Sequence, residues 1–337
     1  MERKMLASGV LLMSLFAFAT IASAATPEQE KLLAELKNYP CRIVHESYRD
    51  NHWVLVVVNA DGSNPVVLTK PGVNENYPHV SPDGKKITFE SEEGTGKEKR
   101  RNVYMMNMDG SGRTRIAEAA RDACWTPDGK AIVYLKDEVD ALQYKDFATK
   151  GLFIYDLATG KTEQHVNHEL YHLYNVCCTL DGNWLVSTVH AGMGCSHGIL
   201  AIEAKGQGVY NLGIPGCRPD ISPDGKKIAW GADDTVLRVA DLEIVDGKPK
   251  VTHARDVATS ENPIHIYHID WSPDSRYVAF SRGPTKESAL GMAPEVVGIK
   301  AAGWNICVAD TSTTNRWVAI TTDGKSNKEP DWFRVAK

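Results

Sequence analysis

The sequence lacks several features that would assign a function directly. It has no Cys-x-x-Cys-His motif, which excludes a covalently attached c-type haem, and no Cys-x-x-Cys pair suited to zinc or thiol redox chemistry. Its 38 basic and 43 acidic residues are mixed without long runs of one sign, so the charge pattern of a nucleic-acid-binding protein is missing. A composition of 42% hydrophobic and 24% charged residues excludes an intrinsically disordered chain.

Long hydrophobic runs are absent beyond the N-terminus, where no later segment has the roughly 18 apolar residues of a membrane-spanning helix. The first 24 residues combine a basic start at Arg3 and Lys4 with an apolar stretch over 6–21 and the small residues Ala22-Ser23-Ala24. This order is typical of a secretory signal peptide, with a retained membrane anchor as the alternative. We therefore expect an exported chain, in the periplasm or an equivalent extracytoplasmic compartment, with no membrane span after signal removal.

Cysteine is present but forms no recognisable framework. Seven cysteines follow the expected signal, and an odd number leaves at least one thiol unpaired or paired with another chain. An exported protein meets an oxidising environment in which disulfides form, but the spacing does not fix their pairing. Cys177 and Cys178 are adjacent, and we expect packed side chains there rather than joint metal ligands.

One short element is abundant: a turn that starts with Ser or Thr and has Asp third recurs five times. The copies are Ser81-Pro82-Asp83-Gly84, Thr126-Pro127-Asp128-Gly129, Thr179-Leu180-Asp181-Gly182, Ser222-Pro223-Asp224-Gly225 and Ser272-Pro273-Asp274-Ser275. Serine first, proline second and glycine fourth is the composition of a type I turn. An alternating or apolar segment follows each copy, and successive copies start 43–53 residues apart. Periods of this length predict the four-stranded blades of an all-β propeller.

The two ends of the chain are expected to share one blade. Residues 42–69 contain the later strands of a blade without a preceding turn motif, whereas Glu329-Pro330-Asp331-Trp332 matches the segment that precedes a turn elsewhere. A C-terminal strand that completes the first blade would close the ring and leave no open sheet edge. This arrangement gives six blades, and seven remain the alternative because the role of residues 284–303 is open.

A short helix precedes the ring. Thr26 and Gln29 form a capping-box pattern ahead of an amphipathic segment that ends near Asn38. The helix packs on the propeller rim in one interpretation and binds a partner in the other. The expected organisation is a signal peptide at 1–24, a helix and lead-in at 25–41 and the propeller at 42–337.

The Ser-Pro-Asp-Gly turns, two Asn-x-Asp-Gly-Ser turns at 59–63 and 107–111, and the signal peptide together resemble the TolB-type propellers of bacterial periplasmic proteins. The resemblance covers residues 42–335 and implies a β-propeller fold. Blades of this type occur in translocation factors, in peptidases that add a hydrolase domain and in polysaccharide lyases. The whole-chain pattern is also similar to the haem-free propeller subunits of hydrazine synthases from anaerobic ammonium oxidisers, which implies partner subunits that carry the haem.

Two positions of each inner strand are expected to face the central channel, because they lie two and four residues before each turn. The polar residues at these positions are His79, Asp122, Asn175, Arg218, Asp220, His268, Asp270, Glu329 and Asp331. Converging polar groups could bind a cation or a small polar ligand. Alternatively they satisfy one another, for example as ion pairs of Arg218 with Asp122 or Asp270.

Histidines are concentrated between residues 165 and 197. They are His165, His168, His172, His190 and His197. Imidazole binds borderline metals, so these residues are candidate metal ligands, although their spacing does not show that they converge.

Three insertions interrupt the blades, at 138–150, 190–198 and 284–303, and a long polar hairpin is expected over 243–264. Loops on a rigid scaffold often carry recognition, and exposed apolar loops mark partner surfaces. The candidates for partner contact are His253, Arg255, Asp256, Met292, Val296 and Trp304. The alternative for 284–303 is a lid folded over its own propeller.

These observations lead to one functional hypothesis and one rival. We expect a non-catalytic exported propeller that binds no cofactor itself and acts as a scaffold for other protein subunits, some of them haem-containing if the hydrazine synthase resemblance holds. The rival is a metal-dependent carbohydrate lyase or hydrolase that uses the histidines of the central face.

Overall fold

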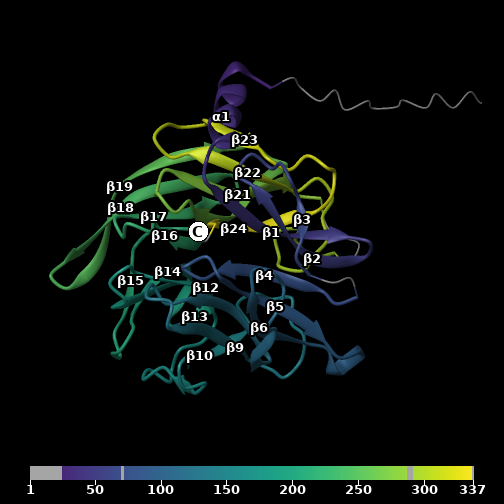
Figure 1. Ribbon diagram of the computed structural model, residues 1–337. Coiled ribbons are helices and arrows are strands. Elements are labelled where there is room, and N and C mark those ends of the chain that lie inside the picture. The colour runs from purple at the N-terminus through teal and green to yellow at the C-terminus, as the bar shows by residue number, and fades with distance from the viewer. Residues whose placement is uncertain (1–24, 70–71, 287–290, 336–337) are drawn as a thin grey trace, which may run out of the picture.

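The computed structural model describes residues 25–69, 72–286 and 291–335. These residues form six four-stranded antiparallel sheets arranged around a central axis (Figure 1). The prediction of an all-β propeller with six blades is confirmed. The expected signal peptide at 1–24 lies outside the described residues. Within the described ranges, no helix is long and apolar enough to cross a bilayer.

In each blade the strands follow one another from the central axis outward. Blade 1 holds β24 (Asn327–Arg334), β1 (Cys41–Arg49), β2 (His52–Asn59) and β3 (Val66–Val67); blade 2 holds β4 (Glu75–Val80), β5 (Lys86–Glu93), β6 (Arg100–Asn107) and β7 (Thr114–Glu118). Blade 3 holds β8 (Ala120–Trp125), β9 (Ala131–Asp137), β10 (Thr149–Asp156) and β11 (Thr162–Gln164); blade 4 holds β12 (Leu173–Cys178), β13 (Trp184–Gly192), β14 (Cys195–Glu203) and β15 (Val209–Asn211). Blade 5 holds β16 (Cys217–Ile221), β17 (Lys227–Asp233), β18 (Val236–Val245) and β19 (Lys248–Thr259); blade 6 holds β20 (Ile264–Trp271), β21 (Tyr277–Pro284), β22 (Asn305–Asp310) and β23 (Trp317–Ala319). One 3-10 turn, η1 (Gly96–Glu98), lies between β5 and β6.

Blade 1 is built from both ends of the chain, as the sequence predicted. Strand β24 pairs antiparallel with β1, where Trp332 lies opposite Ile43 and Arg334 opposite Cys41. This closure brings the C-terminal strand to the middle of the ring (Figure 1). With β24 in place, blade 1 has four strands like the other five blades.

The recurring turn is held by its own side chains. In the first copy, the Ser81 hydroxyl donates to Asp83 Oδ1 at 2.7 Å and accepts from the backbone N–H of Lys86 at 2.9 Å. Gly84 follows with φ 72°, a conformation that glycine adopts without the steric cost of a Cβ. The hydrogen bond from Ser81 is the main cause that lowers the pKa of Asp83. The face of the ring that carries these five turns is called the turn face below, and the opposite one the insertion face.

Helix α1 (Pro27–Lys37) lies against blades 1 and 6, so it packs on the rim, the first of the two alternatives. Thr26 and Gln29 form the reciprocal capping box that the sequence predicted. Leu32 and Leu36 are buried in a core cluster that includes strands of both blades. Glu35 adds ion pairs to Arg276 and Arg316 of blade 6, and α1 therefore clamps the seam where the ring closes.

Candidate functional site

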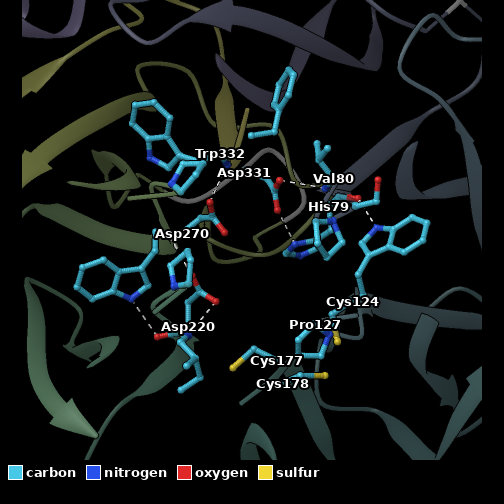
Figure 2. A pocket seen from close by; sticks show the side chains of 18 of the residues that line it. His79, Val80, Cys124, Pro127, Cys177, Cys178, Asp220, Asp270, Asp331 and Trp332 are labelled. Carbon is cyan, nitrogen blue, oxygen red and sulfur yellow. Dashed lines mark hydrogen bonds and ion pairs between the residues drawn. The ribbon is translucent and has the colours of Figure 1, made fainter. Parts of the chain in front are cut away.

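A cavity of about 450 Å³ opens on the turn face, around the central axis. Its wall is built by the last residues of the inner strands and by the turns that follow them. Asp220, Asp270 and Asp331 lie on one side, and the thiols of Cys124 and Cys178 on the other (Figure 2). The ring of inner strands therefore gives a concave site with one acidic and one thiol-lined wall.

The three aspartates link neighbouring blades. Each carboxylate accepts a backbone N–H from the next inner strand: Asp220 from Trp271 at 2.9 Å, Asp270 from Trp332 at 2.6 Å and Asp331 from Val80 at 3.0 Å. This series of hydrogen bonds ties blades 5, 6, 1 and 2 together. The wall of the cavity is thus also a structural belt.

His79 extends this belt into blade 3. Its Nδ1 lies 2.8 Å from Asp331 Oδ2, and its backbone carbonyl accepts the indole N–H of Trp125 at 2.9 Å. Burial opposes protonation of the imidazole, but the hydrogen bond and charge of Asp331 outweigh it and raise the pKa of His79. The His79–Asp331 pair places a titratable cation beside the acidic wall.

Burial and mutual repulsion control the charge of the acidic wall. Burial raises the pKa of Asp220 to about 7. Burial and the charges of Asp331 and Asp220 raise the pKa of Asp270 well above its usual range. Closely spaced carboxyls of this kind retain a proton near neutral pH, and a cationic group that enters the cavity would favour their ionised form.

A second layer of side chains lies deeper along the axis, where each inner strand bulges. One residue per blade adopts a left-handed backbone conformation, with φ between 50° and 56°. These residues are Tyr77, Asp122, Asn175, Arg218, His268 and Glu329. Simple alternation along a regular strand was the basis for placing both layers in the channel, and the bulges show that the strands are not regular there. Residues of both layers nevertheless line cavities of the channel. Asp122 is the exception, because it lies buried beside Glu90.

Side chains from the preceding blade support these strained positions. The backbone N–H of Asp122 donates to Glu90 at 3.0 Å, that of Arg218 to the Thr188 hydroxyl at 2.7 Å, and that of Glu329 to the Ser281 hydroxyl at 3.1 Å. Residues without glycine's freedom hold positive φ at a cost, which such bonds offset. The supporting residues were missed by the sequence analysis because they lie on second strands.

Ion pairs fill the deep layer, but not those that the sequence suggested. Arg218 pairs with Asp146 at 2.7 Å and with Glu329 at 3.5 Å, rather than with Asp122 or Asp270. The expected partners were wrong because Asp146 comes from the 138–150 insertion, which no repeat pattern places. His268 also lies 2.8 Å from Glu329. Burial raises the pKa of Glu329 to about 7.

The 284–303 insertion covers the channel on the insertion face. Its backbone carbonyls accept hydrogen bonds from buried side chains of the ring: Glu295 O from His268 at 2.7 Å, Val296 O from Lys328 at 2.6 Å and Val297 O from Arg101 at 2.9 Å. The lid alternative is therefore confirmed for the described part of this insertion. Residues 287–290 lie outside the described residues.

Trp304 does not contact solvent, so its assignment to a partner surface was wrong. Its side chain is 0% exposed, and its indole N–H donates to Pro284 O at 3.0 Å. Met292 and Val296 are half-buried in the same insertion. The apolar character that suggested a partner surface instead buries the insertion against its own propeller.

The 138–150 insertion covers the neighbouring part of the insertion face. Arg121 donates to the carbonyls of Gln143 and Lys145, both at 3.1 Å, and pairs with Asp137. The axis is thus covered at one face by two insertions and open at the other, where it forms the 450 Å³ cavity. The cavity on the turn face is called the cup below.

The five candidate metal-binding histidines do not converge on one point. His165 lies 2.8 Å from the Glu203 carbonyl, His172 lies 2.9 Å from the Ala191 carbonyl, and His168 is exposed. The rings of His190 and His197 are 5.5 Å apart. Among the described residues, no group of three or more His, Cys, Asp or Glu side chains is arranged to hold a metal ion.

The predicted polar hairpin is strands β18 and β19, which project beyond the ring (Figure 1). His253, Arg255 and Asp256 lie on the outer strand β19 rather than in a loop. Arg255 donates to the carbonyl of Thr311, in the turn after β22, and Asp256 pairs with Arg238 of β18 at 2.7 Å, so both are held by neighbouring segments. His253 has a side chain that is 79% exposed.

Comparisons with known proteins show the fold. No known family profile matches the chain. Dipeptidyl-peptidase 5 of Porphyromonas gingivalis is 23% identical over 168 residues, which cover 47% of this chain and only 17% of the length of that curated relative. The crystal structure of TolB from Acinetobacter baumannii matches 87% of this chain and 66% of its own, with 19% identity and a TM-score of 0.59. Hydrazine synthase of Kuenenia stuttgartiensis matches 92% of this chain and 49% of its own, with 12% identity and a TM-score of 0.56.

Proposed function

We propose that the chain is an exported, non-catalytic propeller that serves as a scaffold subunit of an extracytoplasmic protein complex, and that its cup receives a cationic element of a partner. The observation that carries the proposal is the open cavity with three carboxylates on one wall. Loops on a propeller normally supply its recognition surface. Here the insertions at 138–150 and 284–303 bind their own ring, which leaves the cup on the turn face for a partner.

Electrostatics and shape both favour a cation in the cup. Asp220 and Asp270 share a wall and hold raised pKa values, so a positive charge beside them replaces repulsion with attraction. Three tryptophans also line the cavity, namely Trp125, Trp271 and Trp332. The faces of aromatic rings attract cations. A lysine or arginine side chain presented by a partner matches this lining.

The thiols of the opposite wall support a binding role rather than nucleophilic catalysis. A hydrogen bond to Cys178 and burial raise the pKa of Cys124, and burial raises the pKa of Cys177. A cysteine that serves as the nucleophile of rapid catalytic turnover near neutral pH needs a lowered pKa.

A narrower form of the proposal is that the partners carry haem, as in a hydrazine synthase assembly. The fold likeness to hydrazine synthase and to TolB supports a propeller of this general type. In that assembly the redox chemistry would belong to the partner subunits and this chain would position them.

The proposal is tested by affinity purification from the native organism. Because Arg334 lines the cavity, the tag belongs ahead of Ala25, after the predicted cleavage site, and not at the C-terminus. We expect stoichiometric partner proteins to co-purify with the wild type and to be reduced with Asp270→Lys, while Glu163→Lys on the exposed outer strand β11 leaves them unchanged. Haem absorbance in the co-purified fraction tests the narrower form. A monomer that carries a stoichiometric divalent metal would instead support the lyase.

A further inference from the structure

Three of the seven cysteines line the central cavity. Cys124 is near the end of β8 in blade 3, and Cys177 and Cys178 end β12 in the neighbouring blade 4. The inner strands β8 and β12 are in contact. The other buried thiols lie elsewhere; Cys307, for example, is 1% exposed within the core of blade 6.

Cys124 and Cys178 face each other across the seam between these blades. Both belong to the same apolar cluster, which joins the inner strands of blades 3 and 4. The neighbouring thiol of Cys178 is the main cause that raises the pKa of Cys124, and Figure 2 shows the two sulfur atoms close together at the cavity wall. Cys124 is 7% exposed, whereas Cys178 is half-buried and reachable from the open cup.

Cys177 is engaged on its other side. Its thiol donates to the Val186 carbonyl at 3.6 Å, on the second strand of its own blade. It packs in the apolar cluster between blades 4 and 5. The geometry therefore selects Cys178, and not its neighbour in sequence, as the partner of Cys124.

We propose that Cys124 and Cys178 are a redox-active dithiol, oxidised to an inter-blade disulfide by a low-molecular-weight disulfide such as glutathione disulfide. The thiolate of the more accessible Cys178 attacks one sulfur of the oxidant and expels a thiolate, which forms a mixed disulfide. Cys124 then attacks the Cys178 sulfur and releases the second thiol. The protein pair loses two protons and two electrons, and the oxidant is reduced to two thiols.

The disulfide would change the cup in two ways. It would cross-link blades 3 and 4 where they meet at the cavity, which restricts the unfolded chain. It would also remove two thiol hydrogens from the wall opposite the aspartates. The raised pKa of Cys124 makes the second step slow near neutral pH, so the rate of disulfide formation should rise as the pH rises toward that pKa.

The test uses the purified, folded full chain. The reduced protein is incubated with glutathione disulfide, the remaining thiols are blocked with N-ethylmaleimide, and the peptides are mapped by mass spectrometry without reduction. We expect a peptide that joins Cys124 to Cys178, with Cys307 still alkylated only after unfolding. Cys178→Ser should abolish the cross-link, and the matched control Cys177→Ser should retain it.

A second readout keeps the result interpretable if a variant folds poorly. Oxidation should raise the thermal unfolding midpoint of the wild type and of Cys177→Ser, and leave that of Cys178→Ser unchanged. The proposal is overturned if Cys124 and Cys178 of the wild type are recovered as free thiols or as separate glutathione adducts, or if Cys124 is joined to Cys177.

Discussion

Asp270 is the group whose replacement tests the electrostatics of the cup most sharply. One of its oxygens accepts the backbone N–H of Trp332 at 2.6 Å, and the neighbouring carboxyl of Asp220 helps to raise the pKa of Asp270. Asparagine would keep the acceptor for Trp332 and present an amide N–H₂ to Asp220. Asp270→Asn therefore imitates the protonated form of Asp270, with all of its local bonds retained.

Proton linkage gives the direction in which the free energy of unfolding changes with pH. Burial and neighbouring carboxylates raise the folded-state pKa of Asp270, so between about pH 4 and pH 7 the folded state holds a proton that the unfolded state releases. The free energy of unfolding of the wild type therefore falls as the pH rises through this window. Asparagine has no proton to release, so the free energy of unfolding of the variant does not fall for this reason as the pH rises.

The magnitude is about 1.4 kcal/mol for each pH unit while the folded state keeps the proton. Because the pKa of Asp220 is about 7, the pair keeps at least one proton up to that pH. Between pH 5 and pH 7, the free energy of unfolding of Asp270→Asn should thus gain about 3 kcal/mol relative to the wild type.

Urea unfolding at pH 5, 6 and 7 measures this difference, with Glu163→Gln on the exposed strand β11 as the control that should show no pH-dependent change. A constant loss of stability in Asp270→Asn at all three pH values would refute the reasoning. That outcome would show that the carboxylate is ionised and needed as a charge.

Three further predictions follow from packing and charge. Leu36→Ala in α1 should cost about 3 kcal/mol in thermal unfolding, because Leu36 is 1% exposed, whereas Leu33→Ala, at 38% exposure, should cost less than about 0.5 kcal/mol. Trp304→Ala should cost about 4 kcal/mol, and Trp304→Phe markedly less, if the side chain fills the core rather than a partner surface. Calorimetry should show N-acetyl-lysine amide binding in the cup more tightly at pH 8 than at pH 6, because deprotonation of Asp220 adds a negative charge; the norleucine analogue should not bind.

The turns and the ring closure could be predicted because their chemistry is local and repeated. Ser81, Asp83 and Gly84 make their bonds within one turn, and the same bonds recur in the other copies. The C-terminal strand was predictable because its segment matches the others and the first blade lacked one. Both inferences needed only the sequence of each unit and its period.

The bulges were not predicted because the expected alternation assumes regular strands. Tyr77 and Arg218 hold positive φ without being glycine, so composition gives no warning. One signal was present: proline follows the bulge residue in three blades, at positions 78, 219 and 330. Proline cannot donate to a sheet, and it marks irregular points in strands.

The contacts of the insertions were beyond the sequence for a different reason. Asp146 reaches Arg218, 72 residues away, and Val297 reaches Arg101, 196 residues away. Repeat periodicity places the blades but says nothing of segments outside the repeat. The apolar residues near Trp304 were consistent with either a partner surface or a self-contact, and only the fold distinguishes them.

The central claim is that this propeller acts as a subunit whose open cup receives a partner. Native mass spectrometry of the protein, purified under mild conditions from a fractionated extract of its native organism, tests it directly. We expect a stoichiometric assembly with at least one other polypeptide, which dissociates when Asp270 is replaced by lysine. A free monomer in that fraction, or an assembly that Asp270→Lys leaves intact, would contradict it.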